Sequence, residues 1–260
     1  MTLSPEKSDP LVLKELDISE LDISEIGIWG VAIASFIIGL WAGSLIFLFG
    51  TKIHNPLLTI IGIICQTFLY TGLFITAHDA IHQLVAPKYP KLNRFFGSLA
   101  LFLYSFFSYD RLLKAHWQHH HHPASEADPD FHDGEHKSAG AWYFYFMQRY
   151  WSWWRLVGLI VTYGILHTFL HIPHANLMIF WAIPLLLSSM QLFYFGTFLP
   201  HREPPGGYQN SLRTQSVYLP FLWSFLSCYH FGYHQEHHQN PNIPWWQLPA
   251  IAKISMQSSM

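Results

Sequence analysis

Long apolar runs alternate with short polar segments along the chain, and four of these runs contain no Asp, Glu, Lys or Arg. They cover residues 28–50, 56–77, 156–172 and 177–200. Because about 20 apolar residues in a helix cross a hydrocarbon core of roughly 30 Å, the four runs predict transmembrane helices. Two shorter runs, 95–109 and 217–229, predict interfacial, re-entrant or buried helices. We therefore expect an all-α integral membrane protein with about four transmembrane helices.

The composition supports a membrane location. Hydrophobic residues make up 51% of the 260 residues and charged residues only 12%, whereas a soluble domain carries about 25% charged residues. The net charge of −2 provides no basic surface for nucleic acid, so we expect no nucleic-acid partner. Both cysteines, Cys65 and Cys228, lie in apolar runs, which argues against a disulfide scaffold.

The basic residues predict the orientation in the membrane. With four crossings, 13 of the 14 Lys and Arg residues fall on the side of the termini and the long central loop, and only Lys52 lies opposite. The positive-inside rule makes that side cytoplasmic. Residues 1–26 carry seven carboxylates and no basic leader, so we expect an acidic cytoplasmic tail and not a signal peptide. Residues 27–260 are expected to form one membrane-embedded domain.

Histidine is the unusual residue of this chain, with 18 copies gathered mainly on the predicted cytoplasmic side. Three clusters, at residues 78–82, 116–122 and 230–238, contain histidines at helical spacing. This spacing brings their imidazoles to one face of each helix. His201 lies just after the fourth apolar run. His122 would point away from the other histidines of its cluster on a regular helix, unless Pro123 ends the helix before it. The candidate metal ligands are His78, His82, His116, His119, His120, His122, His201, His230, His234, His237 and His238.

One H-x3-H pair, two H-x2-H-H sets and His201 make nine imidazoles, a number that suits two metal ions with four or five nitrogen ligands each. Neutral imidazole binds iron, zinc, copper or nickel, and iron with open positions permits oxygen chemistry. Asp79, Asp128 and Asp130 are candidates to accept a hydrogen bond from the far nitrogen of a ligating histidine. Glu236 could accept such a hydrogen bond as well, but we expect it to be solvated on the surface of its helix.

The histidine clusters and their surroundings resemble the membrane-bound, histidine-rich di-iron family of acyl desaturases, alkane hydroxylases and carotenoid-oxygenating enzymes. Within it, the chain looks most similar to bacterial β-carotene ketolases of the CrtW type. The matching stretches are F-I-T-A-H-D-A-I-H (74–82), K-A-H-W-Q-H-H (114–120), D-P-D-F (128–131), F-Y-F-G-T-F-L-P-H (193–201), C-Y-H-F-G-Y-H-Q-E-H-H (228–238) and P-W-W-Q-L-P (244–249).

The resemblance implies two iron ions, O2 as co-substrate and oxidation of the C4 methylene of a β-ionone ring to a ketone. Two hydroxylations and loss of water would take β-carotene to echinenone and then to canthaxanthin. The sequence shows neither a G-x-G-x-x-G fingerprint nor a cysteine set for an iron–sulfur cluster. Electrons are therefore expected from a partner, such as a ferredoxin at the cytoplasmic face.

A ring that arrives from the lipid bilayer needs an apolar path to the metals. The candidate tunnel residues are Phe74, Phe107, Phe195, Phe198, Phe231 and Tyr233. A β-carotene 3-hydroxylase, or an acyl-lipid desaturase or alkane hydroxylase, would use a similar site, and the residues alone do not separate these activities. A metal transporter is disfavoured because the predicted spans are free of charged residues.

Overall fold

The computed structural model describes residues 23–53 and 55–258, and within these ranges every regular element is a helix. The predicted acidic tail lies outside the described residues, except for its last four positions, which begin α1. The elements are α1 (Ile23–Gly50), α2 (Pro56–Ile81), α3 (Pro90–Ser105), α4 (Tyr109–His121), α5 (Ala139–Arg149), α6 (Trp153–Gly164), η2 (Ile165–Phe169), α7 (His174–Leu177), η3 (Met178–Ala182), α8 (Ile183–Phe193), η4 (Tyr194–Phe198), α9 (Leu199–His201), α10 (Phe221–Cys228), α11 (His234–Gln239) and α12 (Leu248–Ser258). The elements labelled η are π-helical.

Three helices of the described part are long and apolar enough to cross a membrane: Glu25–Gly50, Pro56–Ile81 and His174–His201. The third is continuous from α7 to α9 and includes two π-helical stretches. The third predicted run, residues 156–172, forms α6 and η2, which have 12 and five residues. At 1.5 Å per residue this helix is only ~25 Å long. It is therefore a shorter apolar helix beside three full-length candidates.

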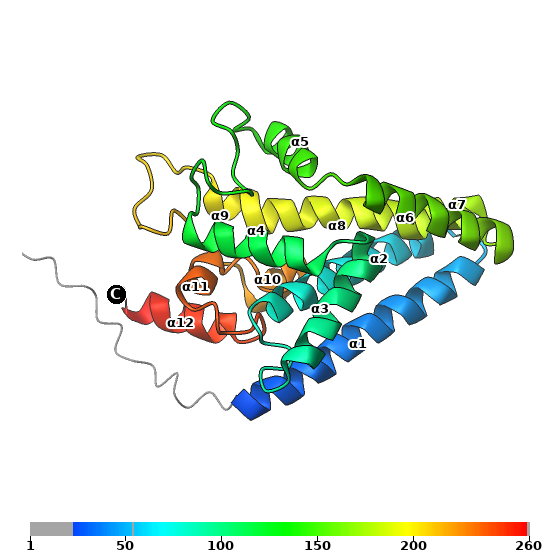
Figure 1. Cartoon of the computed structure of the whole chain (residues 1–260), viewed down its shortest axis with the longest axis horizontal. Helices are drawn as coiled ribbons and strands as arrows, with labels where there is room; N and C mark the ends of the chain where they lie inside the picture. Colours follow the sequence, from blue (N-terminus) through cyan, green and yellow to red (C-terminus); the bar gives the residue numbers. More distant parts are fainter. Residues whose placement is uncertain (1–22, 54, 259–260) are drawn as a thin grey trace, which may run out of the picture.

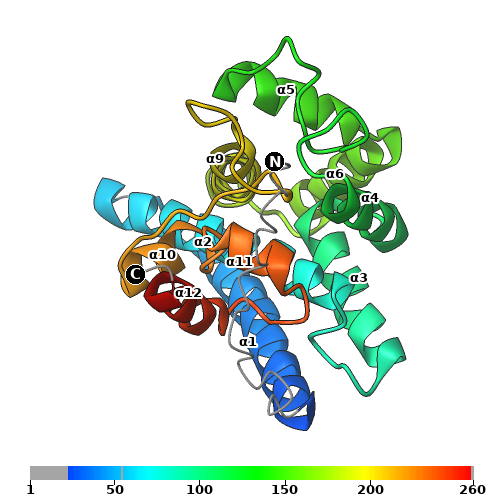
Figure 2. The same ribbon diagram turned by 90° about the vertical axis from the view of Figure 1, so that its left-hand side faces the viewer.

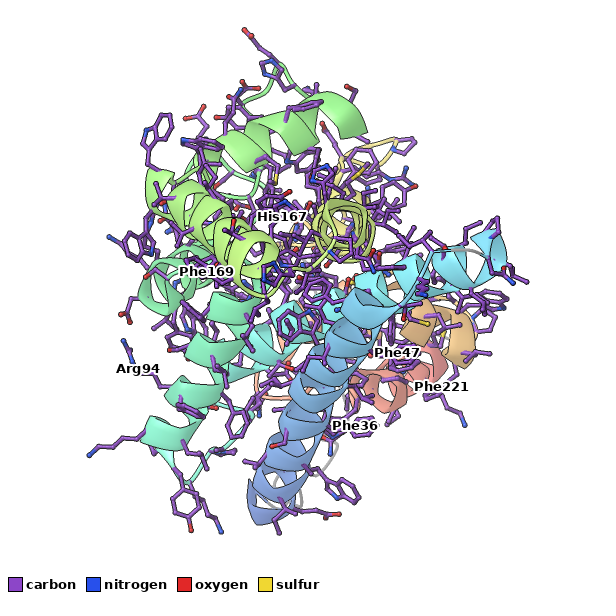
Figure 3. All side chains as sticks on the ribbon, turned by 90° about the vertical axis from the view of Figure 1, so that its right-hand side faces the viewer. Phe36, Phe47, Arg94, His167, Phe169 and Phe221 are labelled. Atoms are coloured by element: carbon purple, nitrogen blue, oxygen red, sulfur yellow. The ribbon has the colours of Figure 1, made fainter. Side chains whose placement is uncertain are left out.

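The outward faces of these helices are apolar, as a lipid environment requires. On α1, Ile28, Phe36 and Phe47 are exposed, and the latter two are labelled in Figure 3. Trp151, Trp153 and Trp154, around the start of α6, are also exposed. Aromatic side chains of this kind favour the headgroup region of a bilayer.

Helix α2 is the centre of the fold and packs against α1, α3 and α8 (Figure 1). It begins at Asn55, whose side chain accepts hydrogen bonds from the backbone N–H groups of Leu57 and Leu58, and Pro56 suits the first helical turn. Farther along, the Thr71 hydroxyl lies 3.0 Å from that of Ser188 on α8 and donates to the Gln191 amide oxygen at 2.7 Å. Such hydrogen bonds join helices where lipid offers no polar partner.

The end of α2 is held in place by polar contacts from the next two helices. Asn93 on α3 accepts from the backbone N–H groups of Val85 and Ala86 and donates to the Ala80 carbonyl at 2.7 Å. The Tyr109 hydroxyl on α4 donates to the same carbonyl at 2.8 Å. Because this end of α2 carries the first histidine pair, these contacts fix its position relative to α4.

Helix α1 approaches the loop after α2 at Gly30, which leads to a prediction about stability. A Cβ at this position would lie 2.5 Å from the Val85 carbonyl oxygen and 2.7 Å from that of Leu84. Backbone atoms cannot rotate away, so Gly30→Ala should destabilise the fold by about 1–3 kcal/mol. Thermal unfolding in detergent measures this loss. Gly39→Ala is the control because it meets no atom within 4 Å, and equal unfolding temperatures for both variants would contradict this packing.

Candidate metal centre

Nine buried or half-buried histidines from four helices meet at one end of the molecule. They come from α2, α4, α9 and α11, which are far apart in the sequence but adjacent in Figure 2. The nine are His78, His82, His116, His119, His120, His201, His234, His237 and His238. All belong to the candidates named from the sequence, and they separate into two groups.

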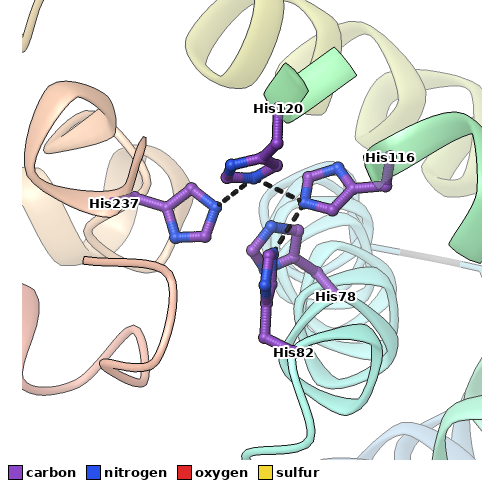
Figure 4. Close-up of side chains that lie close together, drawn as sticks. All are labelled: His78, His82, His116, His120 and His237. Atoms are coloured by element: carbon purple, nitrogen blue, oxygen red, sulfur yellow. Dashed lines mark hydrogen bonds between the residues drawn. The ribbon is translucent and has the colours of Figure 1, made fainter. Parts of the chain in front are cut away.

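The first group contains five histidines whose ligand atoms all lie within 4.8 Å of one another (Figure 4). The Nε2 atoms of His82 and His116 are 2.8 Å apart. The Nε2 atom of His120 lies 3.0 Å from those of both His116 and His237. His78 completes the group from α2, so three helices contribute to it.

The second group contains His119, His201, His234 and His238, again with ligand atoms within 4.8 Å of one another. The Nε2 atom of His238 lies 3.2 Å from that of His119 and 3.1 Å from that of His234. All four side chains are buried. Helices α4, α9 and α11 supply this group, so α4 and α11 serve both.

The spacing within each helix explains the division. On α4, His116 and His120 are four residues apart and turn to the first group, whereas His119, at the edge of their arc, turns to the second. On α11 the arrangement is reversed, because His234 and His238 serve the second group and His237 the first. An H-x2-H-H sequence on each helix therefore suits a centre with two ions.

The geometry of the nitrogens fits metal ions. Ligands at right angles on bonds of ~2.1 Å, a usual metal–imidazole length, lie about 3.0 Å apart. The Nε2 separations of 2.8–3.2 Å agree with that value. Both ring nitrogens of His78 and the Nε2 of His201 are buried without a hydrogen-bond partner. Such orphaned atoms are costly, and coordination to a metal would satisfy one nitrogen of each ring.

The charge state of the imidazoles is also suitable for binding metal ions. Burial and the neighbouring imidazoles lower the pKa of His120 to about 2 and hold those of His116, His237 and His238 well below the ordinary value. These rings are therefore neutral at pH 7 and have a lone pair available for a cation. His119 differs, since Asp128 raises its pKa although burial acts in the opposite direction.

Asp128 orients the His119 ring from behind. Its carboxylate oxygens lie 2.9 and 3.0 Å from His119 Nδ1 and accept from the backbone N–H groups of Ala124 and Asp130, both at 2.8 Å. With its Nδ1 proton committed to the carboxylate, His119 presents Nε2 to the second group. The His201 Nδ1 is similarly engaged by the Arg213 carbonyl at 3.1 Å.

The other carboxylates named from the sequence take different positions. Asp79 accepts from the Trp245 backbone N–H at 3.4 Å, with its Oδ1 3.5 Å from His78 Nδ1. Asp130 accepts from the Tyr150 hydroxyl at 2.5 Å, and burial raises its pKa to about 6. The expectation that Glu236 is solvated was wrong.

Glu236 is buried because the segment before α10 covers it. Its carboxylate accepts hydrogen bonds from the hydroxyls of Ser216 and Tyr218. The contact ties the face of α11 that points away from the metals to this segment. Only the folded structure reveals the covering segment, since its residues come from 18 to 20 positions earlier.

Two further candidate ligands lie outside both groups. Helix α4 ends at His121, and His122, its C-cap, is exposed. His230 is buried, but its Nδ1 lies 3.1 Å from the Ser224 hydroxyl and its ring stacks near Tyr233 and Trp245. The ligand set that the geometry favours therefore contains nine histidines without these two.

A cavity of about 380 Å³ reaches the histidines from the membrane side, a volume in the range of ligand sites. His78, His116, His119 and His234 line one end, so both groups border it. The rest of the lining is mostly apolar, although it includes Asp130, Arg155 and several hydroxyl-bearing side chains. Tyr150 and Arg155 also line it; no pattern in the sequence pointed to either residue.

The tunnel candidates divide into two sets. Phe74, Phe107 and Phe231 line the cavity. Phe195, Phe198 and Tyr233 do not, because each packs elsewhere. Phe195 joins the hydrophobic core and Phe198 packs on Trp142, while the Tyr233 hydroxyl donates to the Leu219 carbonyl at 3.2 Å.

The role of Asp128 can be tested by metal content. Asp128→Asn keeps the shape but removes the charge, so the affinity of the second group for iron should fall about 10- to 100-fold. Metal analysis after dialysis against a graded chelator measures this change. Asp133→Asn is the control, since Asp133 contacts only an exposed loop histidine, His136, and its neighbours. Unchanged iron retention in Asp128→Asn would refute the orienting role.

Apolar helices that surround two histidine groups are the features of a histidine-rich membrane protein with a site that could hold metal ions, and comparison with known proteins agrees. The fatty acid desaturase family profile matches residues 54–160 and 146–259. A β-carotene ketolase of Paracoccus sp. (strain PC1) is 38% identical over 203 residues, which cover 76% of this chain and 81% of that protein. The chain belongs to the fatty acid desaturase family, and within it to the group of the β-carotene ketolases.

Two longer relatives carry related names. A β-carotene 4-ketolase of Protosiphon botryoides is 38% identical over 251 residues, covering 88% of this chain and 64% of that protein. A zeaxanthin 4-ketolase of Chlamydomonas reinhardtii is 36% identical over 275 residues, covering 99% of this chain and 61% of that protein. The chain thus spans about three fifths of the length of these two relatives.

Proposed function

We propose that the chain is a carotenoid 4-ketolase that oxidises the C4 methylene of β-ionone rings to a ketone. The observation that carries this proposal is the apolar cavity that ends on histidines of both groups. It can receive a hydrocarbon ring from the bilayer and hold it beside a metal centre. The names of the relatives supply the identity of the ring and the position of the oxidation.

The nine histidines would hold two iron ions, five at the first position and four at the second. Bound iron would supply the activation of O2 for two successive hydroxylations at one carbon. Loss of water from the resulting geminal diol gives the ketone and takes β-carotene to echinenone and canthaxanthin. The protein supplies fixed ligands on four helices, so the metal positions are set before the substrate arrives.

The residues around the cavity perform two further tasks. The apolar walls exclude water and fix the ring, and a ring that is held close to the oxidant gains rate through positioning alone. Asp130 and Tyr150, hydrogen-bonded to each other at 2.5 Å, form a buried polar pair in the lining. Their contact leaves the Tyr150 hydroxyl engaged, so it does not present a free polar group to a hydrocarbon ring.

We further propose that the histidine end faces the cytoplasm and receives electrons there from a ferredoxin-type donor. Thirteen of the 14 basic residues assigned to that side by the sequence support this orientation. A bilayer location for the whole described domain follows from its apolar helices. Electrons from outside the chain are needed because each hydroxylation consumes one O2 and two electrons.

Expression in a bacterium that makes β-carotene tests the proposed function. Chromatography of the extracted pigment should show echinenone and canthaxanthin. Zeaxanthin or cryptoxanthin in their place would indicate a 3-hydroxylase with the same site. Unchanged β-carotene, with the protein folded, loaded with iron and supplied with a donor, would exclude both and favour an acyl-chain substrate.

A further inference from the structure

A second hollow lies at the end of the molecule opposite the histidines. It is an open groove of about 1040 Å³ between the end of α1 and the connection from η2 to α7. Figure 3 views the molecule from this end, with Phe169 labelled on η2. Apolar side chains such as Trp41, Leu45 and Phe49 form its wall, and Lys52 and Asn176 are among its few polar residues.

The helix formed by α6 and η2 borders both hollows. Leu156 and Leu159 line the cavity at the metal centre, and Leu166 and Leu170 line the groove. These four residues are three, seven and four positions apart, a spacing that keeps side chains on one helical face. A mostly apolar stripe, with the Tyr163 hydroxyl near its midpoint, therefore runs from the cavity to the groove.

The facing helix shows the same arrangement. Ala182, Leu185 and Ser189 line the cavity, and Ala175 lines the groove, at spacings of seven, three and four residues. Tyr163 lies midway between Leu159 and Leu166, and its hydroxyl is 2.5 Å from His174 Nδ1. No side chain of α6 is fully buried, so this face of the helix leaves room for a ligand beside it.

We infer that a carotenoid with two rings lies along the inner face of α6 and η2, with its far ring in the groove. This inference rests on the proposed function and extends it to the half of the substrate that does not react. The stripe from Leu156 to Leu170 is ~21 Å long at 1.5 Å per residue, and the cavity continues beyond it to the histidines. The combined length matches a C40 carotenoid, which is about as long as a hydrocarbon core of ~30 Å is thick.

Filling the groove without touching the metal end tests this inference. Leu166→Trp places an indole in the groove, and Ala175→Phe fills it from the facing helix. Ile165→Trp is the matched control, because Ile165 is about half exposed and lines neither hollow. The measured quantities are β-carotene retained per iron by the purified protein, and the turnover of β-carotene relative to retinal, which has one β-ionone ring and half the chain.

Leu166→Trp and Ala175→Phe should each lower the retained β-carotene about tenfold and reduce the turnover of β-carotene relative to retinal by a similar factor, with iron content unchanged. Ile165→Trp should behave as the wild type. Equal retention in all variants, or an equal loss of turnover on both substrates, would overturn the inference. A wild-type protein that retains β-carotene but forms no ketone would instead contradict the proposed function, since retention reports on the groove separately.

Discussion

His120→Ala loses its bound iron and its ketone formation, whereas alanine at either of the next two positions leaves both intact. This expected result distinguishes one metal ligand from the two histidines that follow it directly in the same cluster. The His120 Nε2 lies 3.0 Å from those of His116 and His237, so it links ligands from two helices. His121 and His122 are exposed and belong to neither group.

The expected loss of turnover for His120→Ala exceeds about 100-fold, because even residues behind a metal ligand cost 10- to 100-fold when they are changed. Iron per chain by elemental analysis and ketone by chromatography measure the two effects. His121→Ala and His122→Ala are the controls. Wild-type iron and ketone in His120→Ala, or iron loss in His122→Ala, would show that the ligand set is wrong.

Leu185→Trp should abolish ketone formation while the iron remains bound. Leu185 lines the cavity from α8 and packs against the hydrophobic core beside it. An indole there occupies the space that the ring needs, and a displacement of ~1 Å in a reacting group can cost about 100-fold in rate. Of the nine histidines, only His201 lies on the same continuous helix, 16 residues beyond Leu185, so the substitution should leave the ligands in place.

Leu187→Trp is the matched control, because Leu187 is on the same helix but 40% exposed and outside the cavity. It should keep at least half of the wild-type turnover. The pair of variants thus distinguishes a blocked cavity from a damaged helix. Ketone formation by Leu185→Trp at the wild-type rate would mean that the substrate reaches the iron by another path.

Periodicity and residue type were sufficient to predict the helical membrane fold and to name the histidines that meet in the structure. Spacings such as His78/His82 and His234/His237/His238 are local, so one helix determines which side chains share a face. The nine histidines that meet in the structure were all among the predicted candidates. The sequence could not show which histidines belong to which group, since that depends on the relative positions of α2, α4, α9 and α11.

Positions that depend on long-range packing were predicted less well. The sequence suggested that Glu236 lies on the surface of its helix, but the segment that contains Ser216 and Tyr218 buries it. Aromatic residues near the histidine clusters were equally plausible tunnel residues in the sequence. Only half of them line the cavity, because neighbouring helices turn Phe195 and Phe198 to other contacts.

The iron content of the purified, active protein tests the central claim most directly. The account predicts two irons per chain, with ketone formation that falls in proportion as a chelator removes them, and no activity when zinc replaces iron. Two ions follow from the separate groups of five and four histidines. Full ketone formation with one iron per chain, or with zinc alone, would contradict it.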